Sequence, residues 1–314
     1  MTENLTMEKF FSLIDGSEYV FEAQRSIKEY VPRRLYKFYS IPSNLCEQQK
    51  RFAQLEAEKI WLSKKKILND PFEMEHLSLH TASHEAQEYY RGKIPEVEFF
   101  CLTNSPLNKL MWSHYADAYK GYCIEFHVGQ PGWIQPVIYE NTLPDLSEYY
   151  QRFYDNKEDL NFSDLNNDQI SKDILRLDYP LISKDTCWSY ENEYRIIFST
   201  PADGSKGHLY SAQNFDLAIS KVIVGAYCSK KNIETLKKAV ANLNRKRYER
   251  QRQLVMSSDK NIPPEKIDAI TQEIWAKALP RNARVEIKMI TWNSQLELIE
   301  TDLMEDDFSG PSEI

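Results

Sequence analysis

The sequence predicts an α+β fold, with a mixed or antiparallel sheet core and helical insertions. Short segments rich in aromatic and β-branched residues alternate with helical segments, but no regular βαβ repeat connects them. The sequence also contains no GxGxxG or Walker-type loop, which doubly wound sheets often use to bind nucleotides. These two observations favour an α+β fold over a doubly wound one.

The expected helices follow from apolar spacing and from residues that begin or end helices. Apolar side chains such as Phe10 and Ile14 recur at helical spacing near the N-terminus. Asp70-Pro71-Phe72-Glu73 has the order of a capping box and predicts a helix that reaches about Tyr90. The other helices are expected within residues 1–31, 44–66, 105–120, 233–243 and 242–283.

The expected strands are short runs of aromatic and aliphatic residues. LYKFYS opens the series, and VEFFCLT and YCIEFHV lie on either side of the helix that contains Trp112. The strands are expected at residues 35–40, 97–103, 122–128, 136–140, 188–199, 221–229, 285–292 and 296–300.

No Gly/Ser-rich or Pro-rich linker divides the chain, so one core with additions is expected. The acidic, Asn-rich segment 142–180 and the charged segment 242–283 are interpreted as insertions into that core. The predicted organisation is an N-terminal helical segment (1–34), a single α+β core (35–300) and a flexible tail (301–314).

Composition limits the class of protein. The net charge of −8 argues against broad duplex DNA binding, although a local basic groove remains compatible with it. The five cysteines contain no CxxC pair and fit free thiols in a reducing compartment. The sequence shows no secretory signal and no run of about 18 apolar residues, so a cytoplasmic protein without membrane spans is expected.

Several segments together resemble the bacterial domain of unknown function 2971 family. They are LYKFYS, LNDPFE, FFCLTNSPLNKLMWSHYADAYKGYCIEFHV and WSYENEYRIIF, with VIVGAYCS as a weaker fifth. Tyr39 departs from the family, which often has Arg there. The family carries no settled activity, so this resemblance implies a relationship and not a reaction.

The order of these segments is also similar to that in ADP-ribosyltransferases, which place His, Tyr and Glu from three segments around NAD. Tyr190-Glu191-Asn192-Glu193-Tyr194 resembles the catalytic strand, and Tyr115 would match the tyrosine that stacks on nicotinamide. Lys37 lies where that family has its His, which is a departure. The resemblance implies an ADP-ribosyltransferase-like fold and an NAD-using enzyme, such as a toxin or phage-defence effector. Its small-molecule partner would be a nucleotide, and its acceptor could be a protein or a nucleic acid.

The expected chemistry depends on fixed carboxylates. Cleavage of the nicotinamide–ribose bond develops positive charge on the sugar, which a nearby carboxylate stabilises. Alternation along a strand would place Glu191, Glu193 and Arg195 on one face. Two close carboxylates should raise one pKa, and Arg195 could hold both ionised or bind a phosphate.

The remaining candidate residues lie in the helix before Gly121. Trp112 and Tyr115, three residues apart, could frame an aromatic slot, and Ser113 and His114 belong to the same expected NAD-binding segment. Each candidate also has a plainer interpretation. Trp112 and Tyr115 are more often core aromatics, and His114 more often a satisfied surface or core residue.

Two other functions remain open. A metal-dependent nuclease could use Asp70, Glu73 and the Glu191/Glu193 pair around Mg²⁺, but no Lys follows this pair. Asp70 and Glu73 are better explained as helix caps. The third possibility is a non-catalytic module that binds a nucleotide or a protein.

Three histidines form a pattern that resembles a metal-binding stripe. His76, His80 and His84 are spaced four apart, so on a helix they lie on one face. Three successive turns cannot all reach one ion, because the outer two histidines lie about 12 Å apart along the axis. No metal site is therefore expected.

Overall fold

The computed structural model describes residues 4–70, 73–74, 81–93, 96–156, 168–200, 203–258, 262–278 and 282–303. The chain forms two compact units that interleave along the sequence. Unit 1 comprises Met1–Pro32, Trp61–Leu102 and Pro131–Leu209, and unit 2 comprises Arg33–Ile60, Thr103–Gln130 and Tyr210–Ile314. The range 35–300, in which sequence analysis predicts a single core, contains parts of both units.

Helices and strands occur in both units, and most of the strand pairs are antiparallel. Among the pairs whose register the structure describes, β6 (Ile138–Tyr139) is parallel to β7 (Ser183–Lys184), and β10 (Leu217–Val224) is parallel to β11 (Glu286–Trp292). This arrangement confirms the predicted α+β class with a mixed, mostly antiparallel sheet.

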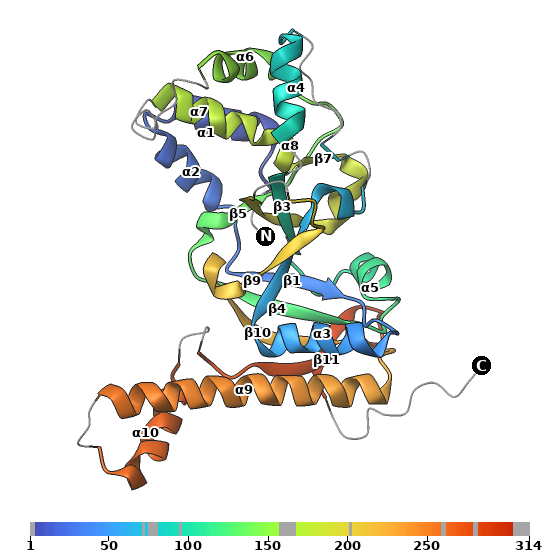
Figure 1. Cartoon of the computed structure of the whole chain (residues 1–314). Helices are drawn as coiled ribbons and strands as arrows, with labels where there is room; N and C mark the ends of the chain where they lie inside the picture. The colour runs from blue at the N-terminus through green and yellow to red at the C-terminus, as the bar shows by residue number, and fades with distance from the viewer. Residues whose placement is uncertain are drawn as a thin grey trace. The chain divides into compact units, whose positions relative to one another are not determined.

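Unit 2 is built on strands in the order β12-β11-β10-β4-β1. β4 (Tyr122–Val128) is central, with β1 (Arg34–Tyr39) antiparallel on one side and β10 on the other. α3 (Leu45–Glu56) and α9 (Lys230–Ser258) run along one side of this sheet (Figure 1), where Phe52 of α3 packs against Tyr122. The remaining elements of this unit are α5 (Lys109–Tyr115), η6 (Ala212–Phe215), α10 (Pro264–Ala276) and β12 (Leu298–Asp302).

Unit 1 contains a smaller set of strands. β8 (Glu193–Ser199) pairs with β3 (Val97–Thr103) and β5 (Ile134–Pro136), while β2 (Lys59–Lys64) pairs with β3 and β9 (Gly207–Ser211). The helices of this unit are α1 (Met7–Gly16), α2 (Val20–Lys28), α4 (His84–Lys93), α6 (Ser147–Asn156), α7 (Asp168–Leu177) and α8 (Tyr179–Ile182).

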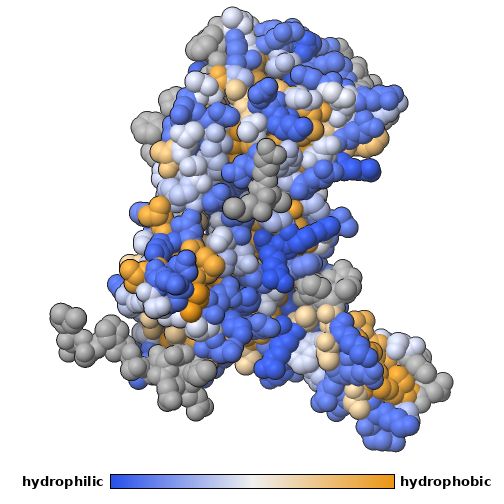
Figure 2. All heavy atoms as spheres, turned by 180° about the vertical axis from the view of Figure 1, so that it is seen from behind, coloured by the Kyte–Doolittle hydropathy of each residue, from blue (hydrophilic) through white to orange (hydrophobic). Residues whose placement is uncertain are grey.

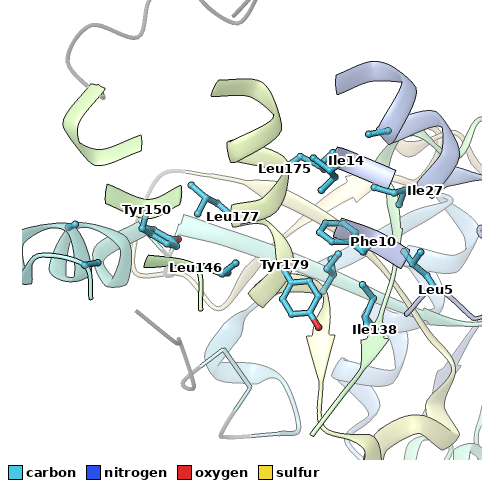
Figure 3. Packing of buried hydrophobic residues seen from close by; sticks show 14 residues of the cluster. Leu5, Phe10, Ile14, Ile27, Ile138, Leu146, Tyr150, Leu175, Leu177 and Tyr179 are labelled. Carbon is cyan, nitrogen blue, oxygen red and sulfur yellow. The ribbon is translucent and has the colours of Figure 1, made fainter. Parts of the chain in front are cut away.

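The core of unit 1 gathers apolar side chains from these helices and from β6. Phe10 and Ile14 of α1 are fully buried beside Tyr179 of α8 and Ile138 of β6 (Figure 3). α1 presents this pair because the two side chains are four residues apart and share a helix face. This core holds together chain segments that are distant in sequence, from Leu5 to Ile182. It also anchors α8, which directly precedes β7.

Several predicted elements are confirmed, and others are wrong for identifiable reasons. The strands at 97–103 and 122–128 have the predicted bounds, and β1 lies within one residue of its prediction. The predicted helix 44–66 ends early: Glu58 has a left-handed φ of 52°, and residues 59–64 form β2 with Ile60 and Leu62 buried. The helix predicted from Asp70 to about Tyr90 lies partly outside the described residues. Within the described residues, α4 begins at His84.

Within the described part of the chain, no helix combines the length and apolar character needed to cross a membrane.

Candidate functional site

The candidate site of unit 1 forms where three short elements meet. β7 ends at Lys184, η5 (Thr186–Glu191) follows, and β8 begins at Glu193. Between the last two, Asn192 adopts a left-handed conformation with φ 43°. Asn tolerates this conformation better than most residues, so it allows the chain to change direction between the two glutamates.

This geometry corrects the prediction that Glu191 and Glu193 alternate along one strand. Glu191 belongs to the 3₁₀ helix η5, and only Glu193 lies on β8. The two carboxylates nevertheless converge, because the Lys184 ammonium donates to Glu191 Oε2 at 2.6 Å and to Glu193 Oε2 at 3.2 Å. Lys184, which the sequence pattern did not identify, is therefore the residue that joins the pair.

Arg195 completes the cluster from the same strand as Glu193. Its Nε donates to Glu193 Oε1 at 2.8 Å and its Nη2 donates to Glu193 Oε2 at 2.9 Å. Nη2 also donates to Glu73, and Nη1 donates to the Leu181 carbonyl at 2.7 Å. Arg195 is 0 % exposed, so it stabilises the interior and is not positioned to bind a phosphate in solvent.

The cluster brings three carboxylates and two cations together in a buried environment. Glu73, Glu191, Glu193 and Lys184 are all buried. Fully ionised, the five groups carry one net negative charge. The ammonium of Lys184 also lies 4.8 Å from the centroid of the Trp188 ring, which adds a cation–π contact.

The carboxyl groups differ in their protonation behaviour. Burial alone would raise the pKa of Glu193, but Arg195 and Lys184 outweigh it and hold this pKa well below its ordinary range. Burial raises the pKa of Glu73, and the attraction of Arg195 does not fully offset it. The sequence predicted that two close carboxylates, Glu191 and Glu193, would raise the pKa of one of them. At Glu193 the pKa is lowered instead. The shift upward occurs at Glu73.

Glu193 also lines a small pocket within unit 1. Tyr139, Asn192, Tyr30, Asn4 and Leu5 contribute to its walls, and its free volume is about 10 Å³. This space suits roughly one water molecule. The Tyr139 hydroxyl accepts a hydrogen bond from the backbone N–H of Glu193 at 2.8 Å, which fixes the start of β8.

Tyr139 remains protonated at neutral pH. Burial, followed by the negative charge of Glu193, raises its pKa. Two of the residues that line the pocket therefore differ in charge, because Glu193 is ionised and Tyr139 retains its proton. Tyr139 is a second residue that the sequence did not reveal, because its position opposite Glu193 depends on the pairing of β6 with β7.

The residues of the expected aromatic slot belong to unit 2. Trp112 is 0 % exposed, and its Nε1 donates to the Pro106 carbonyl at 2.7 Å. Its ring meets Phe38 edge to face with centroids 5.0 Å apart, so Trp112 is a core residue. Tyr115 and Lys37 are partly buried, whereas Ser113 and His114 are exposed. The proposed nearness of Tyr115 to Glu193 concerns residues of different units and remains a prediction.

The residues considered for metal binding do not form a ligand set in the described part of the chain, where no group of three or more His, Cys, Asp or Glu could hold an ion. Arg195 occupies the position between Glu73 and Glu193 that a cation would take. His76 and His80 lie outside the described residues, so the histidine stripe is represented by His84 alone.

Unit 2 contains a separate buried carboxylate on its central strand. Glu125 accepts hydrogen bonds from Tyr36 at 2.9 Å and from Ser220 at 2.8 Å, and Lys221 lies 3.5 Å away. Burial would raise the pKa of Glu125, but these hydrogen bonds and Lys221 lower it. The shared register of β1, β4 and β10 explains the arrangement, since Tyr36 and Lys221 both pair with Glu125.

Comparisons with known proteins identify a family for part of the chain. Neither the curated proteins nor the solved structures include a match, and no comparison shows a relationship to ADP-ribosyltransferases. A family model matches residues 111–196, which run from within α5 through β4 to the first half of β8. The matching family is described as Protein of unknown function (DUF2971), and this match confirms the family resemblance over those residues.

Proposed function

We propose that the chain is an NAD-consuming enzyme that acts in the manner of ADP-ribosyltransferases, with Glu193 as its catalytic carboxylate. The observation that supports this proposal is the position of Glu193, which is held ionised by Arg195 and Lys184 and lines a pocket. A carboxylate that stays charged and fixed is suited to stabilise an oxocarbenium-like sugar, because its orientation needs no rearrangement during the reaction.

Within this proposal each nearby residue has a distinct role. Arg195 and Lys184 are positioning residues, since they act through Glu193 and are themselves buried. Tyr139 contributes a protonated hydroxyl to the pocket and could donate a hydrogen bond to a ribose oxygen. Glu191 is paired with Lys184 and does not line the pocket, so it supports the cluster.

The size of the pocket sets a requirement on the mechanism. Space for roughly one water molecule cannot hold a nicotinamide riboside, so the wall formed by Asn4, Leu5 and Tyr30 must move when NAD binds. NAD should therefore change the exposure of this wall. Hydrogen exchange of the backbone amides near Leu5, measured with and without NAD, tests this requirement.

The central experiment measures nicotinamide released from NAD by the purified full-length chain. The wild-type protein should release nicotinamide, and Glu193→Gln should abolish the release. Glu191→Gln is the matched control, because it removes a carboxylate from the same cluster without changing the pocket wall. Thermal unfolding of all three proteins shows whether a loss of activity reflects unfolding. Absence of release by the wild type, or full release by a folded Glu193→Gln variant, rejects the proposal.

A cell-based measurement addresses the biological role. An NAD-consuming toxin or phage-defence effector should lower the cellular NAD concentration when it is expressed in bacteria. Glu193→Gln should leave that concentration unchanged at equal protein level. A fall in NAD with both proteins would show that the effect does not depend on this carboxylate.

The small pocket also favours one alternative, a non-catalytic binding module. Both carboxylates of the pair are buried and engaged in ion pairs, as expected for a cluster that stabilises the unit. In that case neither glutamate variant changes a binding function except in proportion to its loss of stability. The two-variant comparison above separates this alternative from the enzyme.

A further inference from the structure

The helix α9 carries a strong local excess of positive charge. It contains nine Lys and Arg residues against two Glu, a net of +7 in a chain whose total is −8. Some of these cations are neutralised within unit 2: Arg247 pairs with Glu58, Lys246 lies 3.5 Å from Glu56 and Arg252 lies 2.7 Å from Asp268. The rest of the helix retains a surplus.

The surplus is arranged as a line on one face. Lys231, Lys238 and Arg245 are seven residues apart, so each lies almost directly above the previous one, and all three are exposed. Among the residues that the structure describes, none of the three has an ion-pair partner. The line spans about 21 Å, at 1.5 Å per residue. We define these three side chains as the basic line of α9.

The basic line lies on the side of α9 that faces away from the core of unit 2. Ile233, Leu236, Val240 and Leu243 form the buried face. Lys238 is two positions from Leu236, a rotation of about 200° around the helix axis. The basic line therefore faces solvent.

We propose that the basic line of α9 binds the phosphate backbone of nucleic acid, independently of base sequence. Unpaired cations at regular intervals on a rigid helix can each neutralise one phosphate and release its counterion. Arg245 can also donate two parallel hydrogen bonds to one phosphate. The spacing of about 10.5 Å is close to the screening length at physiological salt, which limits repulsion between the cations before binding.

An anionic membrane fits this face less well. Membrane-binding helices place large apolar side chains beside their cations. Between the members of the basic line, the exposed residues of α9 are Glu234, which pairs with Lys237, and Ala241, and Asn242 is half-buried. In the described parts of α9 and α10, the exposed large apolar side chains are Leu254, Met256 and Ile274, all outside the stretch from Lys231 to Arg245. Figure 2 shows apolar surface on the part of the molecule that these two helices form.

The binding surface is independent of the NAD chemistry proposed above. The negative charge of the chain as a whole predicts no broad duplex binding, and a single helix face is consistent with weak, local binding. Because only about three phosphates are contacted, binding should depend moderately on salt. Each phosphate contributes roughly 0.9 to the slope of log K against log salt on duplex DNA.

The test uses the full-length chain and fluorescent oligonucleotides of RNA and DNA, single-stranded and duplex, in anisotropy titrations at several salt concentrations. The variant Lys231→Gln/Lys238→Gln/Arg245→Gln should lower the salt slope by about 2 to 3 and weaken binding severalfold at low salt. The control variant Lys9→Gln/Arg25→Gln/Lys59→Gln removes the same charge from exposed positions outside α9. It should bind like the wild type.

Three outcomes overturn the proposal. Wild-type protein could fail to bind every oligonucleotide at low salt, or both triple variants could weaken binding equally, which would indicate a general charge effect. Alternatively, the wild type could bind vesicles of anionic phospholipid and no oligonucleotide, which would assign the face to a membrane. Thermal unfolding of both variants confirms that exposed substitutions have left the fold intact.

Discussion

Arg195 and Glu193 lie two residues apart on β8 and form a two-point ion pair inside unit 1, with nitrogen–oxygen distances of 2.8 and 2.9 Å. Neighbours at positions i and i+2 share a face of a strand, so the pair needs no contribution from another element to form. The neighbouring elements complete it: Glu73 and the Leu181 carbonyl accept the remaining guanidinium hydrogen bonds. The guanidinium thus connects three separate parts of unit 1.

Replacing Arg195 with Lys should destabilise the protein although it conserves the charge. An ammonium cannot donate along both edges of the Glu193 carboxylate while reaching Glu73 and Leu181. Breaking a buried pair costs about 3–5 kcal/mol of unfolding free energy, and the charge retained here should bring the loss to the lower end. Chemical denaturation measures it. Arg152→Lys is the matched control, since Arg152 pairs with Asp173 but its side chain is 42 % exposed, and it should cost about 1 kcal/mol or less.

The turn after α5 should become more stable when its strain is relieved. Asp117, Ala118 and Tyr119 all have left-handed φ values, of 48°, 48° and 66°. Each such non-glycine residue costs roughly 1–2 kcal/mol. Ala118 is exposed, so Ala118→Gly removes strain without removing packing. It should raise the unfolding free energy by about 1 kcal/mol, and the greater entropy of the unfolded glycine chain reduces this gain. A measured decrease would contradict this account.

The opposite result is expected at Gly225, which lies against the same turn. A Cβ atom added there would collide with the Tyr119 carbonyl oxygen. That carbonyl accepts a hydrogen bond from the Tyr227 backbone at 3.0 Å and cannot move away freely. Gly225→Ala should therefore lower the midpoint of thermal unfolding. If Gly225→Ala had no effect, the described packing of the turn would be wrong.

Asp178 should make stability depend on pH in the acidic range. Burial raises its pKa to about 6, and the attraction of Lys28 only partly offsets this shift. Between an unfolded pKa near 3.8 and a folded pKa near 6, the native state binds more protons than the unfolded state. Stability from this group is therefore gained as pH falls through about 6, and lost as pH rises through the same range. Asp178→Asn should flatten this part of the profile, measured by chemical denaturation from pH 4 to 7. An unchanged slope would exclude Asp178 as its source.

The sequence predicted the central strands of the fold well because their signal is local. VEFFCLT and YCIEFHV are continuous aromatic and aliphatic runs, and each forms the expected strand with the expected bounds. The helix predicted for 44–66 failed in its second half. Glu58 breaks it through a left-handed backbone, and Lys59–Lys64 gains more from burying Ile60 and Leu62 in a sheet than from helical propensity. Such tertiary pairing cannot be read from one segment.

The candidate site could also be predicted only as far as its residues are neighbours along the chain. The sequence identified Glu191, Glu193 and Arg195, which are close along the chain, but assigned the two glutamates to one strand. It could not identify Lys184 or Tyr139, whose positions depend on the pairing of β6 with β7. One signal was available: a Lys seven residues before Glu191, within ISKDTCW, is a cation in an otherwise acidic stretch.

Trp112 provides a test that separates a core residue from a residue of an NAD slot. Its ring is fully buried, and its indole N–H donates to Pro106. Trp112→Phe should leave that carbonyl without its donor and create a small void, lowering the unfolding free energy by about 2–3 kcal/mol. At a temperature where the variant is folded, its KM for NAD should equal that of the wild type, if the chain consumes NAD as proposed. Tyr115→Phe, in the same helix, serves as the comparison because Tyr115 is only partly buried. A raised KM for Trp112→Phe with unchanged stability would show that this ring becomes accessible and contacts the substrate, which its packing against Phe38 argues against.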